Sequence, residues 1–231
     1  LAKTDRRYPK LLAETHDAPY FLFAKGDLAL LDKWTVAIIG SRKPTERSAE
    51  IAKRIAEYCA SNNYVVLSGL ADGCDWSAHV GALDAKGKTL AVLPHGISAK
   101  VSSNRGGLMS RITSEGGLLV SQFSLNAPAN KGSFVSRDKV QAGMSSVTVL
   151  VESKVDGGSL HACRAAIEYG RQLAFVEPSK LDQSSANRLL EISDTGSLER
   201  IFGSLVPYPN QVKPLKSKED YVLIDPPLGT P

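Results

Sequence analysis

Short apolar runs alternate with longer amphipathic stretches between residues 35 and 206. The apolar runs are rich in β-branched residues and predict buried strands at 35–40, 64–69, 89–94, 118–123, 146–153 and 172–177. Apolar positions at helical spacing predict helices at 46–63, from about 75 to 87, at about 105–115 and at 157–171. Strands joined by helical crossovers of this length lie parallel in one sheet. The pattern predicts an α/β fold with a doubly wound, mostly parallel sheet and residues 35–40 near its centre.

The two flanks differ from this central part in composition. Residues 1–34 mix apolar and polar positions, and we expect them to form an N-terminal extension that packs on the core. Residues 35–206 form the core itself. Residues 207–231 hold half of the twelve prolines, which predicts a proline-rich tail or linker.

Composition narrows the class of protein. The chain has 231 residues with 42% hydrophobic and 23% charged residues, which suits one large folded domain and does not indicate disorder. It has neither an apolar run of about 18 residues, as a membrane span needs, nor the apolar segment of a signal peptide at its start. The three cysteines lie in apolar-periodic stretches without metal-ligand spacing, so we expect them to be packing residues in a cytoplasmic protein. No initiator Met is present, so a piece of a longer chain is expected.

The loops that follow the strands concentrate glycine, serine and basic residues. These loops meet at one edge of a parallel sheet, where ligands bind, and they cover residues 40–47, 68–75, 94–104, 122–139, 152–159 and 177–180. Glycines let backbone N–H groups approach an anion, and helix N-termini attract one. The rim is therefore a candidate phosphate-binding surface with five basic residues: Arg42, Lys43, Lys131, Arg137 and Lys139. Ordinary turn glycines and solvated charges remain an alternative. The net charge of +4 does not decide between these interpretations.

Two nucleotide-binding motifs do not fit this sequence. A dinucleotide-binding GxGxxG does not follow the first strand, and residues 81–89 resemble a phosphate-binding Walker loop with one residue too many between the glycines. Asp75 and His79 stand four residues apart, which would suit acid–base chemistry, but we favour a helix cap by Asp75 and a local hydrogen bond of His79. We predict no catalytic residue, no metal site and no cofactor.

Five motifs in order resemble the DNA-processing protein A family (DprA, also called Smf). They are GSR at 40–42, SGLADGCD at 68–75, TLAVLPHGIS at 89–98, KGSFVSRDKVQAGMS at 131–145 and VLVESKVDGGSLHA at 149–162. The resemblance implies an extended Rossmann-like core that binds single-stranded DNA without catalysis. It also implies a homodimer and a RecA-type recombinase as a partner, in natural transformation or recombination.

The resemblance also places the DNA site. The family's pocket arginine falls on Arg42, and its Lys-x-x-Phe pair falls on Lys131 and Phe134. Cationic grooves with rings on which bases stack are typical of single-strand binding; an anchoring role for Phe134 in the core is the alternative. The full candidate DNA-binding set is Ser41, Arg42, Lys43, Gly69, Gly73, Lys131, Phe134, Arg137 and Lys139, with Gly157, Gly158 and Ser159 as a phosphate-contacting loop.

The chain departs from the family's pattern in places. The family's usual Arg-Asn-Arg turn becomes Arg137-Asp138-Lys139, which puts a carboxylate where phosphates would approach. Asp138 keeps open a defence or antitoxin-like interaction module that has lost DNA binding. A nucleotide-binding enzyme or sensor also stays open, because residues 156–159 faintly resemble the glycine motif of the lysine-decarboxylase-like hydrolases. An internal pairing of Arg42 with Asp72 or Asp75 would likewise argue against a DNA contact.

Overall fold

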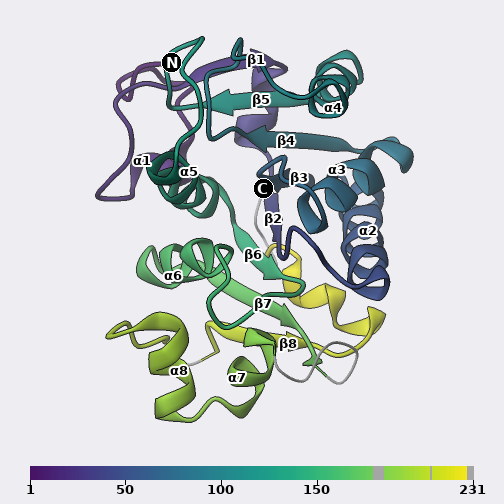
Figure 1. Ribbon diagram of the computed structural model, residues 1–231, viewed down its shortest axis with the longest axis vertical. Coiled ribbons are helices and arrows are strands. Elements are labelled where there is room, and N and C mark those ends of the chain that lie inside the picture. The colour runs from purple at the N-terminus through teal and green to yellow at the C-terminus, as the bar shows by residue number, and fades with distance from the viewer. Residues whose placement is uncertain (179–184, 209, 228–231) are drawn as a thin grey trace.

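The computed structural model describes residues 1–178, 185–208 and 210–227, which form an α/β fold around one eight-stranded sheet (Figure 1). The strand order is β1-β5-β4-β3-β2-β6-β7-β8. The strands are β1 (Phe23–Gly26), β2 (Thr35–Ile39), β3 (Val65–Ser68), β4 (Lys88–Val92), β5 (Leu118–Ser121), β6 (Val147–Leu150), β7 (Gln172–Val176) and β8 (Val212–Leu215). Seven strands run parallel, and β1 pairs antiparallel with β5. The predicted doubly wound, mostly parallel sheet is confirmed.

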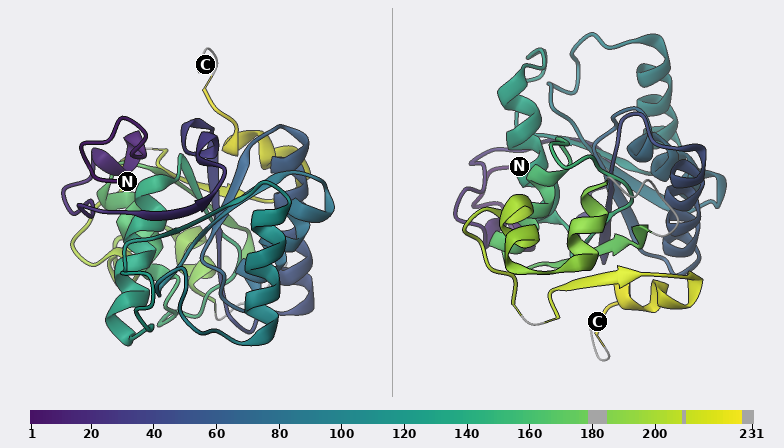
Figure 2. Two further views of the ribbon diagram at one scale, coloured as in Figure 1. Left: turned by 90° about the horizontal axis from the view of Figure 1, so that it is seen from above. Right: turned by 60° about the horizontal axis from the view of Figure 1, so that its bottom comes forward.

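Helices cover both faces of the sheet (Figures 1 and 2). They are α1 (Lys10–Ala13), α2 (Glu46–Ser61), α3 (Cys74–Asp84), α4 (Ser103–Ser114), α5 (Lys131–Met144), α6 (Leu160–Glu168), α7 (Ala186–Ile192), α8 (Thr195–Phe202) and the 3-10 segments η1 (Leu28–Asp32) and η3 (Lys218–Ile224). Val36 and Ile38 of β2 pack with α2 and α3, whereas Ala37 packs with α1 and α5 on the opposite face. This alternation follows from the two-residue period of a strand.

Strand β2 lies inside the sheet, paired with β3 on one side and β6 on the other. All five of its residues are buried, as the continuous apolar run predicts for a central parallel strand. The carboxyl ends of the parallel strands therefore gather their loops at one edge.

The N-terminal residues pack on the sheet. Tyr8, Leu12, Leu22 and Leu30 are buried in a cluster with residues of β3, β4 and α5. Strand β1 extends the sheet beyond β5.

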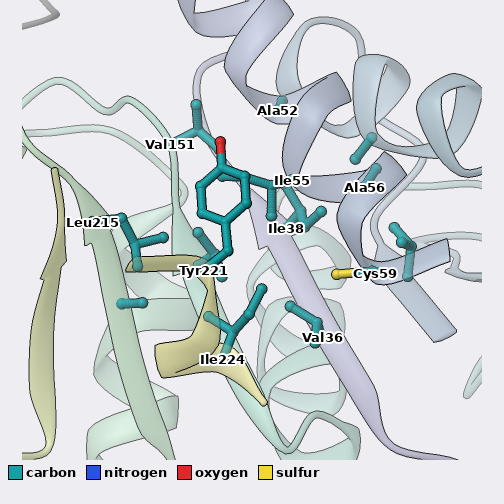
Figure 3. Close-up of a cluster of buried hydrophobic side chains, with 14 of the residues drawn as sticks. Val36, Ile38, Ala52, Ile55, Ala56, Cys59, Val151, Leu215, Tyr221 and Ile224 are labelled. Carbon is teal, nitrogen blue, oxygen red and sulfur yellow. The ribbon is translucent and has the colours of Figure 1, made fainter. Parts of the chain in front are cut away.

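The prediction of a tail or linker after residue 206 is wrong for residues 212–224. Strand β8 pairs parallel with β7 and forms an edge of the sheet, where Pro214 can lie because only one side of an edge strand needs backbone donors. In η3, Tyr221 and Ile224 are buried against α2 and β2 (Figure 3). The Trp34 Nε1 donates a 3.0 Å hydrogen bond to the Ile224 carbonyl oxygen. Residues 209 and 228–231 of the predicted tail, and 179–180 of the predicted loop 177–180, lie outside the described residues.

The prediction of a loop over residues 122–139 is also wrong, since α5 begins at Lys131. Asn130 caps it through a reciprocal pair of hydrogen bonds: its Oδ1 accepts from the Ser133 backbone N–H, and its own N–H donates to the Ser133 Oγ, both at 2.9 Å. This capping box fixes the start of a helix. The glycines and serines in the segment obscured the helical pattern.

The three cysteines are free and buried, as predicted. Burial raises the pKa of each thiol, which leaves Cys59, Cys74 and Cys163 uncharged.

We expect Ile224→Ala to destabilise the protein by about 2–5 kcal/mol, because it leaves a cavity at a fully buried position. The control is Val222→Ala in the same segment, whose side chain is 62% exposed and should contribute little. Denaturant unfolding of both variants measures the difference. Equal stability of the two variants would mean that η3 is not part of the cooperative core.

Candidate nucleic-acid interface

The loop after β2 is fastened to its neighbours by backbone hydrogen bonds. The Ser41 N–H donates to the Glu152 carbonyl oxygen at 2.7 Å, and the Cys74 N–H donates to the Ser41 carbonyl oxygen at 3.1 Å. The Thr45 N–H and hydroxyl both donate to the Glu152 Oε2 at 3.1 Å. Gly73 has a φ of +79°, and a Cβ there would press on the backbone of this loop. The loop that carries Arg42 is therefore held in a defined position.

Arg42 lies over the ring of Phe134, with its guanidinium carbon 4.7 Å from the ring centroid. This cation–π contact joins the loop after β2 to the first turn of α5. Within the described residues the Arg42 guanidinium forms no ion pair. Asp72 pairs instead with Arg105, at 3.3 Å, and the Asp75 carboxylate accepts from backbone N–H groups. The structure thus does not show the alternative in which Arg42 pairs with Asp72 or Asp75.

A pocket of about 420 Å³ opens beside this pair of side chains. Of the predicted site residues, the pocket brings together Ser41, Arg42, Phe134, Arg137, Gly157, Gly158 and Ser159. Arg42 and Phe134 also line a smaller pocket of about 120 Å³, together with Gly69, His95 and Arg105. The ring of Phe134 therefore borders two adjacent compartments.

The loop before α6 forms the opposite wall of the larger pocket. The Ser159 hydroxyl donates to the Ser153 Oγ at 2.7 Å, and a Cβ on Gly157 would collide with the same Ser153 Oγ. Gly158 has no atom within 4 Å of where its Cβ would lie. Gly158 therefore provides unobstructed backbone next to a helix N-terminus, a region that favours anions.

Arg137 lies beneath the pocket and is only 4% exposed. Its Nη1 donates to the carbonyl oxygens of Gly69 and Val92, the latter at 3.2 Å, and its Nε donates to the Asp138 Oδ1 at 2.9 Å. These bonds tie α5 to the ends of β3 and β4. With its Nε and Nη1 donors engaged by the protein, Arg137 supports the floor of the pocket; a direct contact with DNA stays a prediction.

Two carboxylates flank Arg137, the buried Asp75 and the partly exposed Asp138. Burial raises the pKa of Asp75 to about 6, although the positive charge of Arg137 favours its ionised form. Burial also raises the pKa of Asp138, and Arg137 again opposes the shift through its charge and its hydrogen bond. The pocket therefore has carboxylates in its lining and a cation at its mouth.

Asp75 and His79 do not form an acid–base pair at the surface. The Asp75 Oδ2 accepts from the Gly69 and Ala71 N–H groups at 3.0 and 3.3 Å. His79 is fully buried, and its Nδ1 lies 2.7 Å from the Thr89 hydroxyl. Burial lowers the pKa of His79 to about 3. Both residues hold the fold around the site.

The remaining predicted cations lie elsewhere. Lys43 and Lys131 are exposed outside the lining of the larger pocket. The Lys139 Nζ forms a 2.8 Å ion pair with Asp17, whose other carboxylate oxygen accepts from the Tyr169 hydroxyl. Lys139 thus joins α5 to the N-terminal segment rather than facing the pocket. For all of these residues, DNA contact stays a prediction.

Sequence reasoning missed several lining residues, chiefly Gln141, Ser153 and His161. The available signal was the spacing of Phe134, Asp138 and Gln141, which recur at intervals of four and three and so share one helix face. That signal has meaning only if the segment is helical, and the sequence predicted a loop there.

The described residues contain neither a membrane-spanning helix nor a cluster of metal ligands. No helix among them is both long and apolar enough to cross a membrane. They also contain no group of three or more His, Cys, Asp or Glu side chains placed to hold a metal ion.

Together the fold and the site define a Rossmann-like protein whose carboxyl-edge rim combines a cation, an aromatic ring and a glycine loop. The sequence model of the family described as DNA recombination-mediator protein A matches residues 1–198. The chain therefore belongs to this family.

Relatives and solved structures agree with this assignment. DNA processing protein DprA of Streptococcus pneumoniae is 34% identical over 77% of this chain, and the chain spans 62% of that relative's length. The solved structure of DprA from Streptococcus pneumoniae superposes with a TM-score of 0.78 at 30% identity, covering 96% of this chain and 72% of the other. DNA processing protein A of Helicobacter pylori, described for its single-stranded DNA binding mode, superposes with a TM-score of 0.73 at 31% identity, covering 82% of this chain and 85% of the other.

We expect Gly69→Ala to destabilise the protein by about 1–3 kcal/mol, the usual cost of overpacking. A Cβ at this position would collide with the Arg137 guanidinium and lie 2.7 Å from the Asp75 Oδ2. Gly158→Ala is the control, because its Cβ would meet open space. Thermal melting compares the two, and a Gly69→Ala protein as stable as the control would show that Arg137 is free to move.

Acid should weaken the fold through His79. Its folded-state pKa of about 3 lies below the ordinary value of 6.5, so the unfolded chain binds the proton more readily between these values. The contribution of His79 to stability is complete above pH 6.5 and is lost as the pH falls toward 3. The raised pKa of Asp75 acts in the opposite direction between about pH 4 and 6.

Comparing the wild type with His79→Gln isolates this contribution, since Asp75 is common to both. Urea unfolding between pH 7 and pH 4 should show a steeper loss of stability in the wild type. Parallel pH profiles would contradict a buried, neutral His79.

Proposed function

We propose that this chain binds single-stranded DNA at the larger pocket and its rim, as a binding protein without catalysis. The observation that carries the proposal is the placement of Arg42 and Phe134 together at the mouth of the pocket. Single-strand binding combines a cation for the phosphates with a ring on which an unstacked base can lie. In the loop of Gly157, Gly158 and Ser159 on the other wall, the N–H groups of Gly158 and Ser159 serve a second phosphate, while the Gly157 N–H donates to the Lys154 carbonyl oxygen.

Two compartments share the ring of Phe134, which supports this binding mode. A strand that passes over the ring would place successive nucleotides in the two pockets, with Arg42 lining both. A duplex keeps its bases stacked and paired, and it cannot supply a base to the ring without unpairing. Binding should therefore favour single strands over duplex. Membership of the family and the superposition on the Helicobacter pylori protein support the same ligand.

The proposal extends to the setting in which the chain acts. As the family resemblance implies, we propose a cytoplasmic homodimer that delivers single-stranded DNA to a RecA-type recombinase during DNA uptake or recombination. These partners rest on the resemblance, whereas the DNA site rests on the geometry described above.

Arg42→Ala should weaken binding of a dT oligonucleotide by about 1–3 kcal/mol, the range for charge-assisted hydrogen bonds. It should also reduce the salt dependence of binding by roughly one ion. Phe134→Ala should cost a similar amount through lost stacking while leaving the salt dependence nearly unchanged. Fluorescence anisotropy over a salt series measures both quantities.

Arg54→Ala is the matched control, because it removes a cation that pairs with Glu50 on α2 outside the pocket. Melting curves establish that each variant is folded. Full-strength binding by a folded Arg42→Ala protein would overturn the site. Absence of salt-dependent binding in the wild type would favour an interaction module instead, and release of a free base from a nucleoside monophosphate would favour an enzyme.

A further inference from the structure

One polar group in the wall of the larger pocket has no partner. Gln141 is 1% exposed and lines the pocket, and its Nε2 is buried without a hydrogen-bond acceptor. A buried amide N–H group normally has a partner, because leaving it unpaired costs free energy. The Gln141 amide therefore points to a ligand that offers a hydrogen-bond acceptor.

A carboxylate lies one helical turn before this amide. The Asp138 side chain is 13% exposed and lines the same pocket, and its Oδ1 accepts from the Arg137 Nε. Within the described residues, its Oδ2 accepts no hydrogen bond from the protein. A carboxylate can accept about four hydrogen bonds, so acceptor capacity remains for a ligand with N–H groups.

Helix geometry aligns these two groups with the stacking ring. Phe134, Asp138 and Gln141 follow one another at intervals of four and three residues on α5, so they form one stripe that faces the pocket. Phe134 and Asp138 are partly exposed, whereas Gln141 is buried. A base that enters beside the Phe134 ring would place its hydrogen-bonding edge against Asp138 and Gln141.

We propose that the pocket selects guanine from the bound strand, with Asp138 accepting from the N1–H and 2-amino groups and the Gln141 Nε2 donating to O6. The proposal rests on the single-strand binding proposed above. Guanine matches all three contacts, since its Watson–Crick edge carries two adjacent donors and one acceptor. Thymine has a single N–H group, and cytosine and adenine each offer one amino group beside ring acceptors.

This assignment explains how a carboxylate can belong to a DNA site. Beside phosphates, Asp138 would repel the ligand, but Arg42 at the mouth is the cation placed to meet them. Deeper in the pocket, the same carboxylate is complementary to base N–H groups. The structure thus separates a phosphate-binding mouth from a base-reading wall.

The test uses a dT dodecamer and the same oligonucleotide with one central dG, dA, dC or deoxyinosine. We expect the dG oligonucleotide to bind about tenfold more tightly than dT, consistent with a bidentate base contact. Deoxyinosine, which lacks the 2-amino group, should fall between the two. Replacing dG with 7-deaza-dG should leave affinity unchanged, because N7 is not on the edge that is read.

Two variants test the two side chains. Asp138→Asn removes one of the two carboxylate acceptors and should abolish most of the preference for dG while keeping or raising the affinity for dT. Gln141→Met removes the donor at similar volume and should reduce the preference about threefold, as the loss of one hydrogen bond would. Ser136→Ala on the same helix is the control, since Ser136 lines a different pocket.

The outcomes separate this inference from the proposed function. Equal binding of the dG and dT oligonucleotides by the wild type would overturn guanine selection and leave single-strand binding intact. A preference for dG that persists in a folded Asp138→Asn protein would overturn the role of the carboxylate. No binding of any oligonucleotide by the wild type would overturn both proposals.

Discussion

The site depends on one buried cation. Arg137 connects α5 to the ends of β3 and β4 by donating to the carbonyl oxygens of Gly69 and Val92. Its positive charge also stabilises the ionised forms of Asp75 and Asp138. A buried charge is tolerated only when it is paired and its donors are satisfied. Here the pairing also determines where α5 sits, and α5 carries the ring and the polar stripe of the pocket. The contacts of Arg137 therefore both compensate its buried charge and determine the shape of the pocket.

Arg137 also accounts for the glycine in the second motif. At Gly69 the guanidinium occupies the space that a side chain would need. The SGLADGCD motif thus combines two backbone requirements, close approach at Gly69 and a positive φ at Gly73, with a carboxylate at Asp75 that accepts from the loop's own N–H groups. The motif is a structural support for the rim.

The sequence predicted the sheet well because its strands are continuous apolar runs separated by clear turn signals. It failed where packing decided the outcome. Val212 and Leu215 stand among prolines, and only the partners supplied by β7 make the segment a strand. At Lys131, a capping box overrides the low helix propensity of the glycine and serines that follow. The pocket residues Arg42 and Phe134 could be predicted by resemblance, but Gln141 could not, because the feature that distinguishes it is burial without a hydrogen-bond partner.

The ion pair of Lys139 has a consequence for how the pocket walls are held. Helices α5 and α6 provide opposite walls, and Asp17 binds both of them away from the pocket, through Lys139 and Tyr169. The N-terminal segment thereby helps to fix the spacing between α5 and α6. A shift of this segment would change the spacing between the two helices, so the width of the pocket depends on a part of the chain that does not line it.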